Sequence, residues 1–183
     1  MNSILRVPFP RSYWVVPGKF LAGAYPGSAT LAEADIRLAA LATAGVALCV
    51  NLMCPDERDI RGDEFRDYRE TMQSAARTCS RECRCVRFPI VDGGVPHRKT
   101  MVQILNEIDS ELAVRGVVYV HCWGGRGRTG TTVACWLVRH AVATPGEAVE
   151  HLHGLIAHAA DLFHPTPEND EQRDFVRAWR AGH

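Results

Sequence analysis

The sequence of 183 residues has no net formal charge, almost no lysine and no long hydrophobic run. No stretch approaches the roughly 20 apolar residues that a membrane-spanning helix needs, so no membrane span is expected. Residues 1–10 lack the continuous apolar core of a signal peptide. Bulk binding of nucleic acid is also not expected, because it usually requires a basic excess. These absences predict a cytoplasmic protein.

The seven cysteines do not form a pattern typical of secreted, disulfide-bonded domains. Their number is odd and their spacing is uneven, which suits a reducing compartment better than a disulfide framework. Cys79, Cys83 and Cys85 lie close together, but this Cys-x3-Cys-x-Cys group lacks the second half of a structural zinc site. We therefore expect no metal and no cofactor.

The chain also lacks internal repeats, low-complexity segments and an obvious linker. Its length suits one domain with a sizeable core and is short for two. Strands and helical segments alternate along it, which predicts an α/β domain with a central, mostly parallel sheet of four to five strands flanked by helices. The periodicity predicts strands at 13–16, 19–22, 46–53, 85–90 and 117–120, and helices at 31–44, 101–112, 131–141, 145–162 and 168–180. A charged, amphipathic segment covers 56–76.

The most informative segment is His-Cys-Trp-Gly-Gly-Arg-Gly-Arg-Thr-Gly at 121–130. A valine-rich strand precedes it and a helical pattern follows it. Glycines allow a tight loop in which the amides of residues 123–128 turn inward and bind an anion. The positive end of the following helix points into the same hollow. The segment therefore predicts an oxyanion site with a cysteine beneath it.

Cys122 and Arg128 are the candidate reactive pair. A cysteine at a helix N-terminus beside an arginine is favoured as the thiolate, which is the nucleophilic form. Attack on phosphorus would give a phosphocysteine. The planar fork of Arg128 can bind two phosphoryl oxygens, and its charge would stabilise the transition state. The amides of Trp123, Gly124, Gly125, Arg126, Gly127 and Arg128 would complete the cradle.

The signature Cys-x5-Arg-Thr-Gly resembles that of the cysteine-dependent protein tyrosine phosphatase superfamily, nearest its compact dual-specificity branch. The resemblance implies one phosphatase catalytic domain over residues 1–183, with metal-independent hydrolysis. It implies that the Thr129 hydroxyl stabilises the Cys122 thiolate as a leaving group in the second step. His121 matches a histidine that orients the loop, although a packing role alone is the alternative.

Asp92 is the candidate general acid. It lies in a glycine-containing loop after a strand, thirty residues before Cys122, and residues 88–96 resemble the mobile acid loop of dual-specificity phosphatases. A positioned acid contributes about 10²- to 10⁴-fold in rate. The alternative is a turn aspartate that bonds its own backbone. Asp56 and Asp59 are weaker rivals, since their charged run is interpreted as a solvated helix face.

Three further residues have open roles. Residues 167–173 resemble a late segment whose glutamine faces the site, so Gln172 either orients the hydrolytic water or lies on a helix surface. Asn169 stands where that segment often has threonine. Arg126, inside the loop, either favours substrates with additional negative charge or is solvated, and Trp123 either walls the pocket or packs against the core.

The expected function is hydrolysis of protein phosphotyrosine, with phosphoserine and phosphothreonine as further substrates. Alternatives within enzymes are non-protein phosphoesters: a phosphoinositide, a phosphosugar, a nucleotide or an RNA 5′-phosphate. A non-catalytic phosphate-binding module is a second class, although the chain keeps the nucleophile, the arginine and the acid. Rhodanese-like sulfur transfer is a third, disfavoured by Arg128, Thr129 and Asp92.

Overall fold

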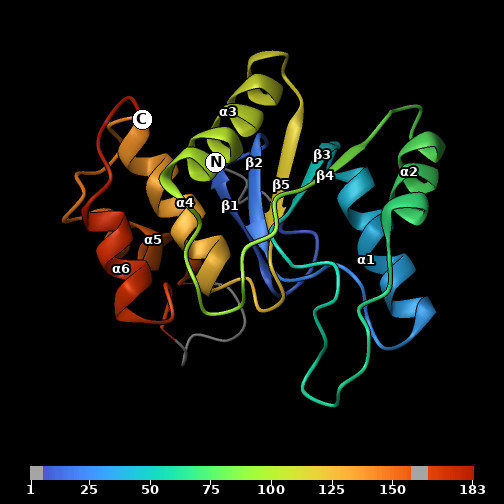
Figure 1. The fold of residues 1–183 in the computed structure, drawn as a ribbon. Helices are drawn as coiled ribbons and strands as arrows, with labels where there is room; N and C mark the ends of the chain where they lie inside the picture. The colour runs from blue at the N-terminus through green and yellow to red at the C-terminus, as the bar shows by residue number, and fades with distance from the viewer. Residues whose placement is uncertain (1–5, 158–164) are drawn as a thin grey trace.

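The computed structural model describes residues 6–157 and 165–183, and its centre is a five-stranded mixed sheet (Figure 1). The strand order is β1-β2-β5-β3-β4. β1 pairs antiparallel with β2, and the remaining neighbours are parallel. The predicted α/β class and the mostly parallel sheet are confirmed. The strands are β1 Ser12–Val16, β2 Phe20–Gly23, β3 Val46–Asn51, β4 Arg84–Arg87 and β5 Val117–His121.

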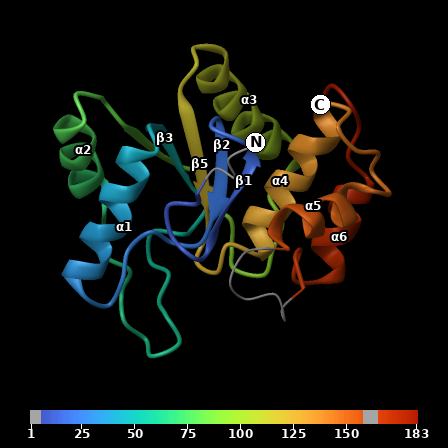
Figure 2. The same cartoon turned by 180° about the vertical axis from the view of Figure 1, so that it is seen from behind.

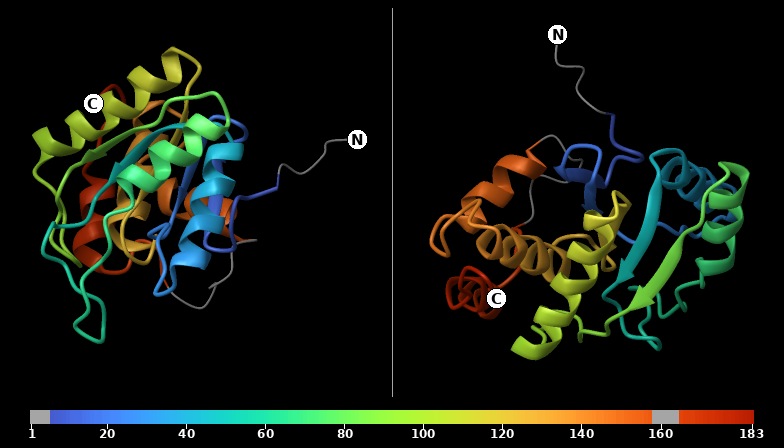
Figure 3. Two further views of the ribbon diagram at one scale, coloured as in Figure 1. Left: turned by 90° about the vertical axis from the view of Figure 1, so that its right-hand side faces the viewer. Right: turned by 90° about the horizontal axis from the view of Figure 1, so that it is seen from above.

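Helices cover both faces of the sheet, as the two opposite views show (Figures 1 and 2). Among the described helices, α1 and α2 pack in one apolar cluster and α3, α4, α5 and α6 in the other, and the view from above shows the sheet between the two layers (Figure 3). Each face has its own cluster of buried apolar side chains. The first layer is α1 Leu31–Thr43 and α2 Arg69–Thr78; the second is α3 Arg98–Ala113, α4 Gly127–Arg139, α5 Ala148–Ile156 and α6 Asp170–Arg177.

Residues 55–68 differ from the expectation of a helical segment over 56–76. The helix begins only at Arg69, and the preceding residues form a loop that turns back on itself through a bridge between Arg58 and Glu64. The Asp59 carboxylate closes the turn by accepting bonds from the amides of Arg61 and Asp63 at 2.8 and 3.0 Å. Gly62, with φ of +85°, adopts a backbone conformation that a helix excludes. The interpretation of Asp56 and Asp59 as a helix face was wrong.

Other element boundaries shift as well: β3 ends at Asn51 instead of residue 53, α3 begins at Arg98 instead of residue 101, and α6 spans Asp170–Arg177 instead of 168–180. α4 begins at Gly127 instead of residue 131, so Arg128 and Thr129 lie in its first turn. β4 ends at Arg87, although the amides of Phe88 and Ile90 still bond to the carbonyls of Asn51 and Leu52. Within the predicted helix 145–162, the structure shows α5 over Ala148–Ile156, and residues 158–162 of that prediction lie outside the described residues.

The parallel strands β3 and β5 end at the same edge of the sheet, where Asn51 pairs with His121. Chemistry in open α/β sheets gathers at this edge, because the loops after neighbouring parallel strands meet there. Figure 1 shows the loop after β5 and the loop 55–68 at this lower end of the molecule. Among the described residues, no helix has both the length and the apolar character that crossing a bilayer requires.

Candidate active site

The loop between β5 and α4 is tightly packed against the end of β2. Gly125 has φ of +76°, and a Cβ there would lie 2.4 Å from the carbonyl carbon of Gly23. The carbonyls of Trp123 and Gly124 accept bonds from the Tyr25 amide and the Arg11 guanidinium, both at 3.0 Å. Only glycine fits at position 125, because any Cβ there would clash with the backbone of β2. The sequence therefore determines the conformation of this loop closely.

Cys122 lies directly after β5, five residues before α4, and its side chain is buried. It is close enough to Arg128, in the first turn of α4, for the two groups to interact electrostatically. The first turn of a helix has unpaired backbone N–H groups and a partial positive charge. A thiolate near this turn would be stabilised.

Arg128 is the most heavily bonded side chain of the site. Its NH1 donates to Glu57 Oε2 at 2.6 Å and to the Ile90 carbonyl at 3.0 Å. Its NH2 donates to Glu57 Oε1 at 2.7 Å and lies 2.8 Å from Asp92 Oδ1. Burial by itself would lower the pKa of Arg128, but the Glu57 bonds and the neighbouring negative charges raise it. The guanidinium stays charged and is held in one orientation.

Asp92 meets Arg128 with its carboxylate, so the structure brings these two predicted residues together. About half of the Asp92 side chain is exposed, and its loop turns at Gly93 and Gly94, where the Gly94 amide bonds the Val91 carbonyl at 2.9 Å. Asp92 therefore occupies one of the two terminal nitrogens of the guanidinium that would bind an oxyanion.

The start of α6 holds the Asp92 loop from the other side. Asn169 caps the helix by accepting a bond from the Gln172 amide at 3.0 Å, and its Nδ2 donates to the Gly93 carbonyl at 2.7 Å. Gln172 is fully buried, and its Nε2 donates to the Gly94 carbonyl at 3.3 Å. The surface alternative for Gln172 was wrong.

The contact between α6 and the loop 121–130 is close at Gly127. A Cβ on Gly127 would lie 2.2 Å from Glu168 Oε2 and 2.8 Å from Gln172 Nε2. Glu168 also lies 3.4 Å from Arg126 NH2. Gln172 therefore lies between the Asp92 loop and the start of α4.

His121 is buried and neutral. Burial lowers its pKa to about 3. Its Nδ1 lies 3.1 Å from the Cys122 carbonyl, and its Nε2 lies 2.6 Å from the Tyr68 hydroxyl. Because a carbonyl only accepts, Nδ1 carries the proton of the neutral ring and Tyr68 donates to Nε2. His121 thus links the backbone of Cys122 to Tyr68, the N-cap residue of α2.

The remaining loop residues make structural contacts. The Thr129 hydroxyl donates to the Gly23 carbonyl at 3.4 Å. Trp123 packs edge-on against Phe65, with ring centroids 5.7 Å apart. Arg126 pairs with Glu168.

Three contacts of the site were not predicted from the sequence. They are the pairing of Glu57 with Arg128, the bond of Tyr68 to His121, and the bond that Asn169 donates to the Gly93 carbonyl. Glu57 and Tyr68 belong to the segment that was interpreted as a charged helix. The available signal was Pro55 together with Gly62, two residues that interrupt helices. A loop there would have allowed an acidic residue to reach the buried arginine.

A cavity of about 540 Å³ opens beside the loop, next to Trp123. Four arginines and three acidic residues line it among others, so it carries charge of both signs. The arginines are Arg11, Arg37, Arg61 and Arg66.

A family model described as "Swiss Army Knife protein, DSP-PTPase phosphatase domain" matches residues 10–181. The tyrosine-protein phosphatase cdc-14 of Caenorhabditis elegans is 37% identical over 59 residues, which are 32% of this chain and 8% of that protein. Matches to eight curated relatives cover from 8% to 54% of their length, so this chain corresponds to a part of each.

Solved structures share the fold over nearly the whole chain. Tk-PTP in its active form has a TM-score of 0.69 at 18% identity, covering 92% of this chain and 95% of that one. PTPMT1 in complex with PI(5)P has a TM-score of 0.64 at 19% identity, covering 91% and 92%.

Proposed function

Because the chain belongs to the DSP-PTPase phosphatase domain family of Swiss Army Knife proteins, we propose that it hydrolyses phosphomonoesters through a phosphocysteine at Cys122. The observation that carries this is the meeting of three groups at one edge of the sheet. Cys122 follows β5 directly and interacts electrostatically with Arg128 in the first turn of α4, and Arg128 contacts the Asp92 carboxylate at 2.8 Å. These positions support a nucleophile, an anion-binding fork and an acid at one site.

Substrate binding begins with an exchange of anions at Arg128. The NH1 group of Arg128 donates to Glu57 and to the Ile90 carbonyl. Its NH2 group donates to Glu57 and forms an ion pair with Asp92. A phosphoryl group can therefore take Nε and the NH2 hydrogen that Asp92 releases, which is the bidentate face of the fork. The loop amides of residues 123–128 bind the other oxygens.

In the first chemical step the Cys122 thiolate forms the S–P bond while the P–O bond to the leaving group breaks. Asp92, displaced from Arg128 and protonated, gives its proton to the departing oxygen. In the second step water attacks the phosphocysteine, Asp92 takes the proton, and the Cys122 thiolate leaves with the help of the Thr129 hydroxyl. Gln172, which touches both loops, is placed to orient that water, and His121 orients the cysteine.

Protein phosphotyrosine is the substrate that we propose first, with phosphoserine and phosphothreonine after it. A second candidate is a non-protein phosphoester with further negative charge, such as a phosphoinositide. The cavity next to Trp123 supports it, since four arginines against three acidic residues line a space larger than one phosphate requires. A fold neighbour, PTPMT1, was solved in complex with PI(5)P.

We also propose that residues 1–183 act as one catalytic domain, because both helix layers pack on the same sheet. All seven cysteines are free thiols. A reducing compartment preserves such thiols, so we propose a cytoplasmic location.

The test of the chemistry is hydrolysis of a chromogenic aryl phosphate in the presence of EDTA from pH 5 to 8. Wild type is expected to turn over, Cys122→Ser to be inactive, and Asp92→Asn to be slower by about 10²-fold or more at neutral pH. Asp63→Asn, in the neighbouring loop, is the control. Activity that survives in Cys122→Ser, or that requires a metal, would refute the mechanism.

The substrate test compares release of phosphate from a phosphotyrosine peptide and from soluble PI(5)P. The variant carries both Arg61→Ala and Arg66→Ala. If the phosphopeptide is the substrate, this double variant changes kcat/KM for the peptide and for PI(5)P by the same factor. If a polyanionic ester is the substrate, it lowers kcat/KM for PI(5)P alone.

A further inference from the structure

Three cysteine thiols meet inside the protein, away from Cys122. The sulfurs of Cys49, Cys83 and Cys85 all lie within 4.8 Å of one another, and those of Cys49 and Cys83 are 3.9 Å apart. Among the described residues, no fourth histidine, cysteine or carboxylate joins the group within that distance. A packed core requires only apolar surface, so the convergence of three sulfurs calls for another explanation.

The strand register creates this cluster. Cys49 on β3 is the direct partner of Cys85 on β4, and Cys83 precedes β4 by one residue. Cys49 and Cys83 are buried in the apolar cluster under α1 and α2. Cys122 belongs to the cluster on the opposite face of the sheet. The thiol cluster is therefore separate from the candidate active site.

The spacing of the sulfurs matches three-coordinate binding of a metal ion. Metal–thiolate bonds of about 2.3 Å place three sulfurs of a trigonal site about 4 Å apart. The Cys49–Cys83 distance already has this value, and the limit of 4.8 Å requires the remaining distances to shorten by less than 1 Å. Small side-chain rotations suffice for such a contraction.

We propose that Cys49, Cys83 and Cys85 form a three-thiolate site for a soft, thiophilic metal ion of low coordination number, with Cu(I) as its representative. Soft thiolates select Cu(I), Zn²⁺ and iron–sulfur clusters, whereas protein zinc and cluster sites normally use four ligands. The sulfurs of Cys49 and Cys83 lie in the apolar cluster and that of Cys85 at its edge, and a set of three thiolates suits Cu(I) best. Binding forms three Cu–S bonds, and each thiol that ionises releases its proton to solvent.

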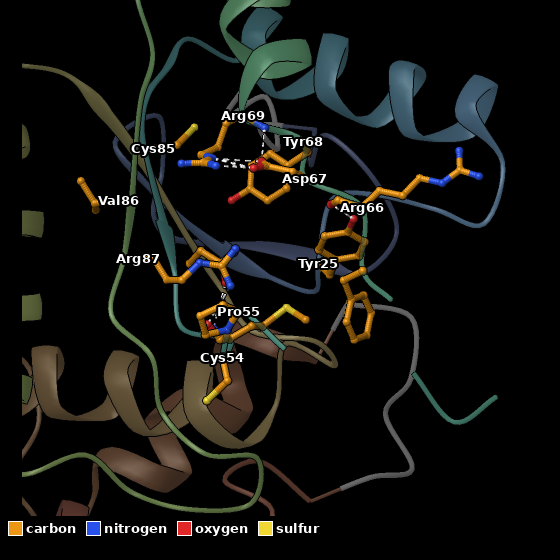
Figure 4. Close-up of a pocket in the computed structure, with 13 residues that line it drawn as sticks. Tyr25, Cys54, Pro55, Arg66, Asp67, Tyr68, Arg69, Cys85, Val86 and Arg87 are labelled. Atoms are coloured by element: carbon orange, nitrogen blue, oxygen red, sulfur yellow. Dashed lines mark hydrogen bonds and ion pairs between the residues drawn. The ribbon is translucent and has the colours of Figure 1, made fainter. Parts of the chain in front are cut away.

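An ion can reach the cluster from solvent past Cys85. Cys85 is only partly buried and lines a cavity of about 80 Å³. Figure 4 shows Cys85 beside Arg69 at one end of this cavity, with Cys54 towards the other end. Because Cys49 and Cys83 are buried, Cys85 is the first ligand that an incoming cation meets.

The sequence offered a different triplet. Cys79, Cys83 and Cys85 are neighbours along the chain, but the fold replaces Cys79 with Cys49, which is 34 residues before Cys83. The expectation of no metal rested on spacing within the chain. It could not include a ligand supplied by the adjacent strand.

The test is anaerobic titration of the full-length, reduced Cys122→Ser protein with Cu(I), in competition with the chelator bicinchoninate. Removing Cys122 prevents the catalytic thiol from binding the probe. We expect one Cu(I) per chain with thiolate-to-copper charge-transfer absorption. Cys85→Ala is expected to weaken binding by more than about 100-fold, because losing a ligand costs more than losing an outer partner.

Cys54→Ala and Cys79→Ala are the matched controls, since Cys54 lines the same cavity and Cys79 is the sequence neighbour. Both are expected to bind as the parent does. Circular dichroism checks folding, and Cys85→Ala is the least disruptive ligand variant because Cys85 is partly exposed. No uptake by the parent, unchanged uptake by Cys85→Ala, or equal loss in Cys54→Ala would overturn the site.

Discussion

Two segments meet at the candidate active site and contribute different kinds of groups. The segment 121–130, which joins β5 to the first turn of α4, contains the residues proposed as the nucleophile and the anion-binding guanidinium. The loop 55–68 supplies Glu57 and Tyr68, which contact Arg128 and His121. The first segment contains the groups proposed to touch substrate, and the second holds those groups in place.

The difference shows how a small domain builds a charged site at the edge of a core. A buried arginine without a carboxylate partner would be costly, because removal of a charge from water is compensated only by pairing and hydrogen bonds. Glu57 provides this compensation from another part of the chain. Variants in the first segment should therefore abolish chemistry, and variants in the second should weaken it.

Arg128→Lys tests the first segment most severely. A lysine retains the charge but cannot bind two oxygens with one planar fork. We expect kcat/KM for an aryl phosphate to fall by about 10²- to 10³-fold, comparable with the loss of a transition-state donor. Arg139→Lys, at the far end of α4, is the control. A loss of less than tenfold would show that Arg128 acts only through its charge.

The second prediction concerns the pH dependence of the unfolding free energy that arises from the buried His121, which bonds Tyr68. The folded-state pKa of His121 is lowered to about 3, against about 6.5 in an unfolded chain. Below pH 6.5 the unfolded state binds more protons, so this contribution to stability is complete above pH 6.5 and is lost as pH falls towards 3. The slope is about 1.4 kcal/mol per pH unit.

Chemical denaturation of wild type and His121→Asn between pH 4.5 and 7 measures this effect. The difference in unfolding free energy between the two proteins should be largest at pH 7 and shrink with acid. A difference that does not change with pH would mean that the pKa of His121 is the same in the folded and the unfolded protein, so that burial does not lower it.

Glu57→Gln tests the second segment. The amide keeps one acceptor for Arg128 but loses the charge and the bidentate pairing. We expect kcat/KM to fall by roughly tenfold, about 1.4 kcal/mol, with the alkaline limb of the pH profile unchanged because Asp92, the proposed acid, is retained. Glu64→Gln, in the same loop but exposed and paired with Arg58, should have no effect. A loss as large as that of Arg128→Lys would remove the distinction between the two segments.

Asn169→Asp makes the smallest change. The aspartate still caps α6, so thermal stability should not change, but it cannot donate to the Gly93 carbonyl. We expect kcat to fall a few-fold with KM nearly constant, because the Asp92 loop is less well held. Asn169→Thr should behave in the same way. If kcat is unchanged while stability falls, Asn169 serves only as a cap.

The sequence predicted the first segment far better than the second. Cys122, Arg128 and the glycines lie within one short motif whose spacing determines their arrangement, and Asp92 follows a strand that ends at the same edge. Glu57 reaches Arg128 across 71 residues, and a charged run gives no sign of which carboxylate turns inward. Cys49 meets Cys83 and Cys85 only because β3 and β4 are neighbours in a particular register, which periodicity does not reveal.

Catalysis through a phosphocysteine at Cys122 is tested most directly by capture of the covalent intermediate. Wild type would be mixed with aryl phosphate, quenched in acid within the first turnover and digested for mass spectrometry. We expect one added phosphoryl group on the peptide that contains Cys122, together with a burst of the leaving phenol of matching amplitude. Neither signal is expected in Cys122→Ser. Turnover with no covalent phosphate, or with the phosphate on another residue, would contradict it.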